Sequence, residues 1–524
     1  MLSPSIVALT EKLKSQKKAH ITATNGDSLI NVNRITEKAG ALYEKVRYLV
    51  DYKDERHIRR SAIERIAKRK IVFEGGNDAI GMSLVQELIA GRYLANNSIP
   101  EKAIEELNTI VSKYITLVQS LPEGLPKMPK YRNAILSIMS SEIESFFFSG
   151  NEDDFVADAF FATVADDVRV SDLQFSQSEV PTQVNIACYR SLLNSDDEAL
   201  RYKLWNKHNP TWVGQTDIAQ IQNIGPTCPN ILDSIQASLE NPLSLKLIPK
   251  LNNHAIYFSI IRELVHAYGA ESERVISDPE MRERFIKDYL EKNYKHQFSK
   301  ARSSAVRAVL YIFCTKIVIA LAMEVPYQIY VIKEIEYIPI ATNVLVHPIV
   351  LMFMTLTVGK LGDENTKKIL QGVEKIITSE SGKLIRIPPI TVSIFTVLFY
   401  CLYVFLFMIV FGVIIVSLFK FNFSIVSIFL FLCFLALISY FALRIRHSAN
   451  KWKVTQENDK IFGIMFNLFA LPIIKTGKWL SRKFSSINLF VFILDFIIET
   501  PFKFVLNFSD AFVSFLKEKQ DDVY

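Results

Sequence analysis

Two long runs without a charged residue constrain this chain more than any other feature of its sequence. Ile387–Phe419 contains 33 residues and no charge, and after the single Lys420 a further 23 uncharged residues make up Phe421–Leu443. A helix rises 1.5 Å per residue, so about 20 apolar residues cross the roughly 30 Å hydrocarbon layer of a bilayer. The pair therefore predicts two membrane-spanning helices, at about 390–416 and 424–443, joined by a tight turn.

Two segments upstream are weaker candidates for further spans. Residues 338–358 are uncharged, with Pro348 as an expected kink. The candidate span at about 305–323 contains the apolar run Ala308–Met323, which Lys316 interrupts. A lysine at the middle of a membrane costs about 2.5–3.5 kcal/mol on insertion scales unless it reaches the interface or finds a partner. We therefore expect 305–323 to span the membrane, with a slanted helix that turns back near Pro326 as the alternative.

The charges of the connecting loops predict how the spans are oriented. Basic residues gather before the first span, between residues 360 and 386, and after the last span, whereas residues 324–337 hold one lysine against three glutamates. Cytoplasmic loops carry the excess of Lys and Arg in membrane proteins. The pattern therefore predicts a multi-pass protein of the cell membrane with four spans and both termini in the cytoplasm.

The region before the spans has helical periodicity. Apolar residues recur at intervals of three and four between residues 34 and 70, while sustained alternation of apolar and polar residues is scarce. The predicted fold class is therefore all-α, with a soluble cytoplasmic helical domain over residues 1–300 and a transmembrane domain over 301–453. Residues 454–524 are predicted to form amphipathic helices at the membrane interface, with packing on the soluble domain as the alternative. We also expect Lys287–Arg307 to continue as helix into the first span.

Charge is distributed unevenly along the soluble region. Residues 51–70 are rich in Lys and Arg, and residues 142–199 are rich in Asp and Glu. The acids between 153 and 167 have the spacing of the solvated face of an amphipathic helix. The basic segment predicts either a surface laced with salt bridges or contact with anionic lipid headgroups, and lipid is favoured over nucleic acid because the chain is membrane-anchored.

The motifs that resemble known catalytic or metal sites are all incomplete. Gly76–Ser83 has the spacing of a phosphate-binding loop, but Met82 stands where the phosphate-contacting lysine is required. Glu263 and His266 lie one helical turn apart, without the second histidine of a zinc protease or the repeated motif of a di-iron bundle. The five cysteines contain no CxxC pair. No cofactor and no metal site is therefore predicted.

The first two spans hold the polar residues of greatest interest. These are Lys316, Glu324, Asn343 and His347. Polar side chains within a membrane are costly to expose to lipid, so they mark functional candidates by default. The structural alternative is hydrogen bonding between helices that holds the bundle together.

The two-part plan, with the stretches Arg47–Arg60 and Asn343–Pro348, resembles uncharacterised multi-pass membrane proteins of small-genome bacteria. Because that group has no established activity, the resemblance implies nothing about function. The leading prediction is a non-enzymatic membrane-anchored scaffold or envelope-associated protein. Its expected partners are the lipid bilayer and a protein that binds the cytoplasmic domain, and nucleic acid is not expected as a partner. The alternative is a small oligomeric channel or transporter with a polar path through the first two spans.

Overall fold

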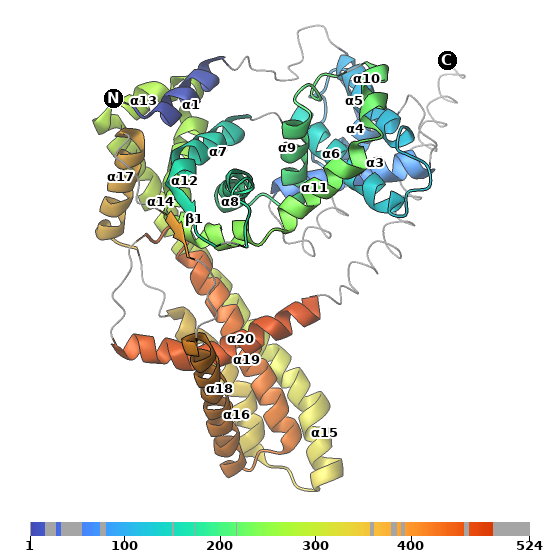
Figure 1. Cartoon of the computed structure of the whole chain (residues 1–524). Helices are drawn as coiled ribbons and strands as arrows, with labels where there is room; N and C mark the ends of the chain where they lie inside the picture. Colours follow the sequence, from blue (N-terminus) through green and yellow to red (C-terminus); the bar gives the residue numbers. More distant parts are fainter. Residues whose placement is uncertain are drawn as a thin grey trace, which may run out of the picture. The chain divides into compact units, whose positions relative to one another are not determined.

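The computed structural model shows an almost entirely helical chain (Figure 1). It describes residues 2–15, 28–32, 55–73, 80–148, 151–172, 174–215, 217–356, 361–378, 385–388, 394–454 and 461–485. These residues form two compact units. The helical unit comprises the residues up to Glu273 together with Ile376–Pro388, and the span unit comprises Arg274–Lys375 and the residues described between 394 and 485.

The described residues of the helical unit are mainly helical, as its periodicity predicts. The helices are α1 (Pro4–Ser15), α3 (Glu55–Phe73), α4 (Ile80–Ala90), α5 (Lys102–Gln119), α6 (Met128–Phe147), α7 (Asn151–Val164), α8 (Val180–Leu193), α9 (Asp197–His208), α10 (Ile218–Ile224), α11 (Cys228–Glu240) and α12 (Leu243–Tyr268). Two short strands, β1 (Val168–Val170) and β2 (Ile385–Ile387), pair in parallel with Val168 beside Ile385. Helices α13 (Ser272–Ser277) and α17 (Asp363–Thr378) contain the boundaries between the units.

The helices of the helical unit pack in two groups. Helix α9 packs against α6 and α11, and α3 and α5 also pack against α6. In the second group α7 and α8 pack against α12, and α1 packs against α7. Buried aromatic rings fill both groups: Trp205 contacts Trp212 edge to face in the first, and Phe160 stacks on Phe258 at 4.8 Å in the second. The boundary between the groups therefore runs between α9 on one side and α7 and α8 on the other (Figure 1).

The span unit contains the predicted membrane-length helices. Among the described residues, four helices are long and apolar enough to cross a membrane: Pro279–Val331, Tyr337–Thr355, Val397–Lys420 and Ile425–His447. They correspond to α14 (Pro279–Ile319) with its continuation, α16 (Tyr337–Leu356), α18 (Ile394–Lys420) and α19 (Ile425–Ala449). The prediction of an all-α chain with four such helices after a helical N-terminal region is confirmed.

Helix α14 runs without a break from the basic stretch into the first span, as predicted. It continues through the π-helical segments η3 (Ala320–Glu324) and η4 (Gln328–Ile332), with α15 (Val325–Tyr327) between them. Pro326 lacks an N–H and its ring clashes with the carbonyl one turn earlier, which favours such widened turns. The chain therefore passes Pro326 as helix, and the alternative of a turn back at this proline is wrong.

Helices α14, α16 and α19 form the packed centre of the span unit. Leu351, Ile438 and Ala442 are buried together and contact Ala308 and Ile312 of α14. Helix α18 leaves most of its apolar surface exposed, including Phe399, Phe405 and Met408. Water would penalise such a surface, whereas lipid tails do not. The four apolar helices are therefore compatible with a membrane-embedded protein.

One helix follows the spans within the described residues. Helix α20 (Ile461–Ser485) crosses α19 (Figure 1), and Gly477 lies so close to the Ala436 backbone that no Cβ would fit between them. Trp479 is exposed beside Lys478 and Arg482. The prediction of further amphipathic helices in this tail falls on residues 486–524, which lie outside the described residues.

Candidate functional site

The structure brings the four predicted intramembrane residues together. The side chains of Lys316 on α14, Glu324 at the end of η3, and Asn343 and His347 on α16 are all 2% exposed or less. The Lys316 ammonium donates to Asn343 Oδ1 at 2.8 Å, and Asn343 Nδ2 donates to Glu324 Oε1. One amide therefore bridges a buried cation and a buried carboxylate.

His347 attaches this cluster to α19. Its Nδ1 lies 2.9 Å from the carbonyl oxygen of Asn343, and its Nε2 lies 3.0 Å from the carbonyl oxygen of Phe431. A neutral imidazole carries one N–H and can donate to one of these carbonyls, whereas an imidazolium can donate to both. The Phe434 ring neighbours both basic groups: Lys316 Nζ lies 3.9 Å from its centroid, and the centroid of the His347 ring lies 6.2 Å from it.

Sequence reasoning identified the polar members of this cluster and missed the rest. Phe431 contributes its carbonyl oxygen to His347, and Phe434 contributes its ring face to Lys316. Both residues lie in an apolar run, and nothing in such a run indicates which phenylalanine will contact a polar group. Gln328 is 2% exposed and accepts from the Glu336 N–H at 2.9 Å, so it closes the turn that follows the first span. A glutamine in an apolar helix could have been noticed, because amides in membranes also need partners.

A second candidate lies in the helical unit, at the boundary between its two helix groups. A cavity of about 320 Å³ opens there, and we call it the seam cleft. Its apolar lining comes from the buried residues Ile186, Leu200 and Leu204, together with Phe155. Its polar groups come in pairs from three helices: Asp154 and Asp158 of α7, Asn185 and Tyr189 of α8, and Lys203 and Lys207 of α9. Ligand pockets occur preferentially at such boundaries.

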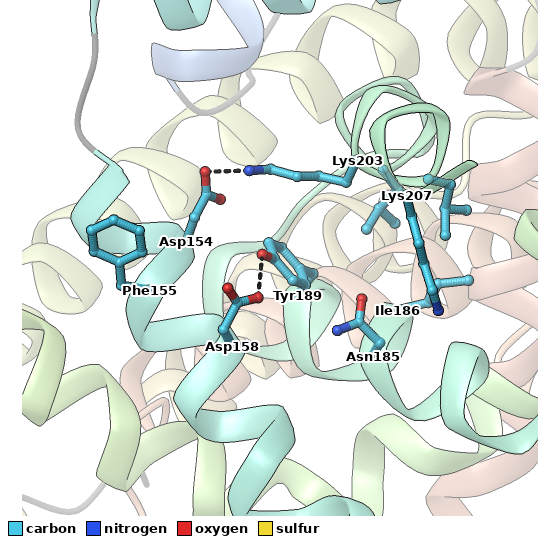
Figure 2. A pocket seen from close by; sticks show the side chains of 10 residues that line it. Asp154, Phe155, Asp158, Asn185, Ile186, Tyr189, Lys203 and Lys207 are labelled. Atoms are coloured by element: carbon cyan, nitrogen blue, oxygen red, sulfur yellow. Dashed lines mark hydrogen bonds and ion pairs between the residues drawn. The ribbon is translucent and has the colours of Figure 1, made fainter. Parts of the chain in front are cut away.

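Charges of opposite sign face each other across the seam cleft. Figure 2 shows Lys203 reaching over to Asp154, with which it forms an ion pair. Asp158 accepts from the Tyr189 hydroxyl at 3.2 Å and pairs with Lys12 of α1 at 3.4 Å. The same view places Asn185 and Lys207 on the other side of the cavity. The predicted acidic helix is therefore present, but Asp154 and Asp158 contact neighbouring helices and are not a purely solvated face.

Helix α9 is fixed in position by the basic helix α3. Asp196 caps α9 by accepting from the Ala199 N–H at 3.0 Å, and both nitrogens of the Arg60 fork also donate to its carboxylate. Burial alone would raise the pKa of Asp196, yet hydrogen bonds from His57 and Arg60 hold that pKa well below its usual range. With the Arg59–Glu144 pair at 3.1 Å, these contacts favour the interpretation of the basic segment as a salt-bridged surface.

The other sequence candidates have structural partners or fall outside the described residues. His266 binds Asp153 at 2.8 Å, and this hydrogen bond raises the pKa of His266. Residues 76–79 of the glycine-rich stretch lie outside the described residues, and α4 begins at Ile80. No group of three or more His, Cys, Asp or Glu side chains suited to a metal ion occurs within the described parts of the chain.

Comparison of the sequence with protein-family models found no match, and searches of curated proteins and of solved structures found none either.

Proposed function

We propose that the chain is a non-enzymatic, membrane-anchored scaffold of the cell membrane, with four spans and with both termini and the helical unit in the cytoplasm. The four membrane-length helices support the anchor. The excess of Lys and Arg at residues 360–386 and 444–453 supports the orientation. The helical unit is then free to bind a protein partner at the cytoplasmic surface.

The observation that carries this proposal is how the intramembrane cluster uses its polar groups. Asn343 accepts from Lys316 and donates to Glu324, while His347 reaches the backbone of α19. The cluster thus joins the three central helices of the span unit. Groups that are engaged with one another in this way act as a clamp between helices. A clamp of this kind stabilises a membrane anchor. Binding of a protein partner is then the task of the helical unit.

Helix α20 fits the same anchoring role. Its exposed residues include Leu468 and Leu471 in the first half, and Lys478, Trp479 and Arg482 in the second. Indole and basic side chains prefer the boundary between lipid tails and water. We propose that α20 lies in this interface and that the anionic headgroups of the bilayer contact its basic half.

A second candidate function is a small oligomeric channel or transporter, and one observation favours it. Glu324 Oε2 is buried and has no hydrogen-bond partner within the described residues. A carboxylate oxygen of this kind, on a side chain that shares Asn343 with Lys316, is a place where a proton or cation could bind. Four spans are few for a monomeric transporter, so this function also requires assembly of several copies.

Flux through reconstituted vesicles separates the two functions. The full chain is reconstituted with a pH-sensitive dye inside, and proton and K⁺ flux are measured for the wild type and for Glu324→Gln. If the chain is a scaffold, the flux of protons and of K⁺ with either protein should equal the flux in protein-free vesicles. Flux in the wild type that Glu324→Gln abolishes would overturn the scaffold and support the channel or transporter.

A further inference from the structure

The charges of the seam cleft restrict what it can bind. Its α7 wall presents Asp154 and Asp158, one helical turn apart, and its α9 wall presents Lys203 and Lys207, also one turn apart. A purely anionic ligand would meet the two carboxylates, and a purely cationic ligand would meet the two ammonium groups. Like charges placed together are a strong means of excluding the wrong ligand. A ligand that carries both signs satisfies both walls.

Two donors with spare capacity, Lys207 and Asn185, line the cavity. Within the described parts of the chain, the Lys207 ammonium makes one long contact, 3.5 Å to the Thr182 hydroxyl. Asn185 lines the same cavity and is half-buried. Lys203 is held by Asp154, so an anionic group that reaches Lys207 and Asn185 can also recruit Lys203. An oxyacid group, carboxylate or phosphate, has the acceptor oxygens that several N–H donors require.

The carboxylates on the opposite wall suit an ammonium group. If Lys203 turns toward the anionic end of a ligand, Asp154 loses its partner and can accept from the ligand instead. Asp158 already accepts from Tyr189 and pairs with Lys12 at 3.4 Å, and a carboxylate with two oxygens has the capacity for a further donor. A primary ammonium offers three N–H groups, enough to bridge two carboxylates one turn apart.

The apolar lining and the volume set the size of the ligand. Ile186 of α8 and Leu200 and Leu204 of α9 are 6% exposed or less and supply apolar lining beside the charged groups. A cavity of about 320 Å³ lies at the small end of the range for ligand pockets. The space accommodates a compact molecule with an apolar portion between or beside its charged ends.

We propose that the seam cleft binds a small zwitterion that carries a primary ammonium and an oxyacid group, with Asp154 and Asp158 holding the ammonium and Lys203 and Lys207 the acid. An amino acid with an apolar side chain has this chemistry, and so does the phosphoethanolamine headgroup of a lipid. Occupation replaces the Asp154–Lys203 pair and ties the two helix groups together through the ligand. This inference is independent of whether the spans anchor or conduct.

The test is a titration of the full chain in detergent, followed by calorimetry. Leucine is compared with isoamylamine and 4-methylpentanoate, which lack its carboxylate and its amine respectively, and phosphoethanolamine is compared with inorganic phosphate. We expect saturable binding of leucine or phosphoethanolamine and at least about tenfold weaker binding of the matched single-charge compounds. If phosphoethanolamine binds and leucine does not, the titration is repeated with nanodiscs of phosphatidylethanolamine or of phosphatidylglycerol. Binding to the first kind of nanodisc only identifies a lipid headgroup as the ligand, and binding to neither identifies a free metabolite.

Variants decide whether any binding occurs in the seam cleft. Lys207 is exposed, so Lys207→Gln should fold normally, and we expect it to weaken zwitterion binding by about tenfold. Asp158→Asn tests the opposite wall with the same expectation. Lys250→Gln, at an exposed position of α12 outside the cleft, is the matched control and should bind as the wild type does. The proposal is overturned if neither zwitterion saturates the chain below about 10 mM, if single-charge compounds bind equally well, or if Lys207→Gln behaves like Lys250→Gln.

Discussion

Asn343 is the residue on which the intramembrane cluster depends, and replacing it by leucine should destabilise the span unit markedly. The leucine has a similar volume and no polar atom, so Lys316 and Glu324 lose the amide that bridges them. Removing one partner from a buried ionic network costs about 3–5 kcal/mol. Ordinary interhelical hydrogen bonds in membrane proteins contribute about 0.6 kcal/mol each. Because Lys316 and Glu324 can move toward each other and recover part of the loss, we expect about 2–4 kcal/mol.

The free energy of unfolding of the full chain in bicelles, measured by steric trapping, provides the assay. Thr315→Val is the control, since Thr315 precedes Lys316 on α14 and, among the described residues, its hydroxyl bonds only to the Tyr311 carbonyl of the same helix. It should stay within about 0.5 kcal/mol of the wild type. Replacing all three charged or amide groups by apolar residues, with Lys316→Met and Glu324→Met added to Asn343→Leu, should restore most of the lost stability. The reasoning is refuted if Asn343→Leu is no less stable than the control.

Three further predictions concern other contacts. Gly477→Ala should lower the free energy of unfolding by about 1–3 kcal/mol or detach α20 from α19, because the added methyl group meets the α19 backbone. Detachment is measured as the rate of trypsin cleavage at the basic end of α20 in detergent, and an unchanged rate and stability would contradict the close crossing. Glu142→Leu removes the carboxylate that lies 2.6 Å from the ammonium of buried Lys113, and it should lower the free energy of unfolding by about 3–5 kcal/mol. Urea unfolding followed by tryptophan fluorescence measures this loss, and a value below about 1 kcal/mol would contradict a structural role for the pair. The raised pKa of His266 implies a contribution to stability that is complete at low pH and is lost as the pH rises through the folded-state pKa. His266→Gln should therefore lower the melting temperature near pH 5 and leave it unchanged near pH 9. An equal loss at both pH values would refute this origin.

The membrane-length helices were predictable because their signal is local. An apolar run such as Phe421–Leu443 leaves no alternative conformation that satisfies its backbone in lipid, so a helix follows from composition alone. The same reasoning found Lys316, Glu324, Asn343 and His347, since each is a costly exception within its run. The passage of the helix through Pro326 was less certain, because whether a proline kinks or ends a helix depends on the widened turns around it.

The seam cleft could not be found from the sequence. Its polar residues come from three helices separated by up to about 50 positions, and the i, i+4 spacings of Asp154 with Asp158 and of Lys203 with Lys207 are those of any charged helix face. Only tertiary packing places the two faces opposite each other. The return of residues 385–387 to pair with β1 is likewise a long-range contact, and three-residue strands leave no periodicity to detect.

Cysteine accessibility in intact cells tests the central claim, four spans with both termini in the cytoplasm, most directly. The five native cysteines are replaced, and single cysteines are placed at Glu334 and Lys420 in the two turns predicted to be outside, and at Glu364 and Lys451 in the segments predicted to be inside. A membrane-impermeant maleimide should label positions 334 and 420 in intact cells, and positions 364 and 451 only after the membrane is permeabilised. Labelling of 364 or 451 in intact cells, or protection of 334 or 420, would contradict the four-span topology.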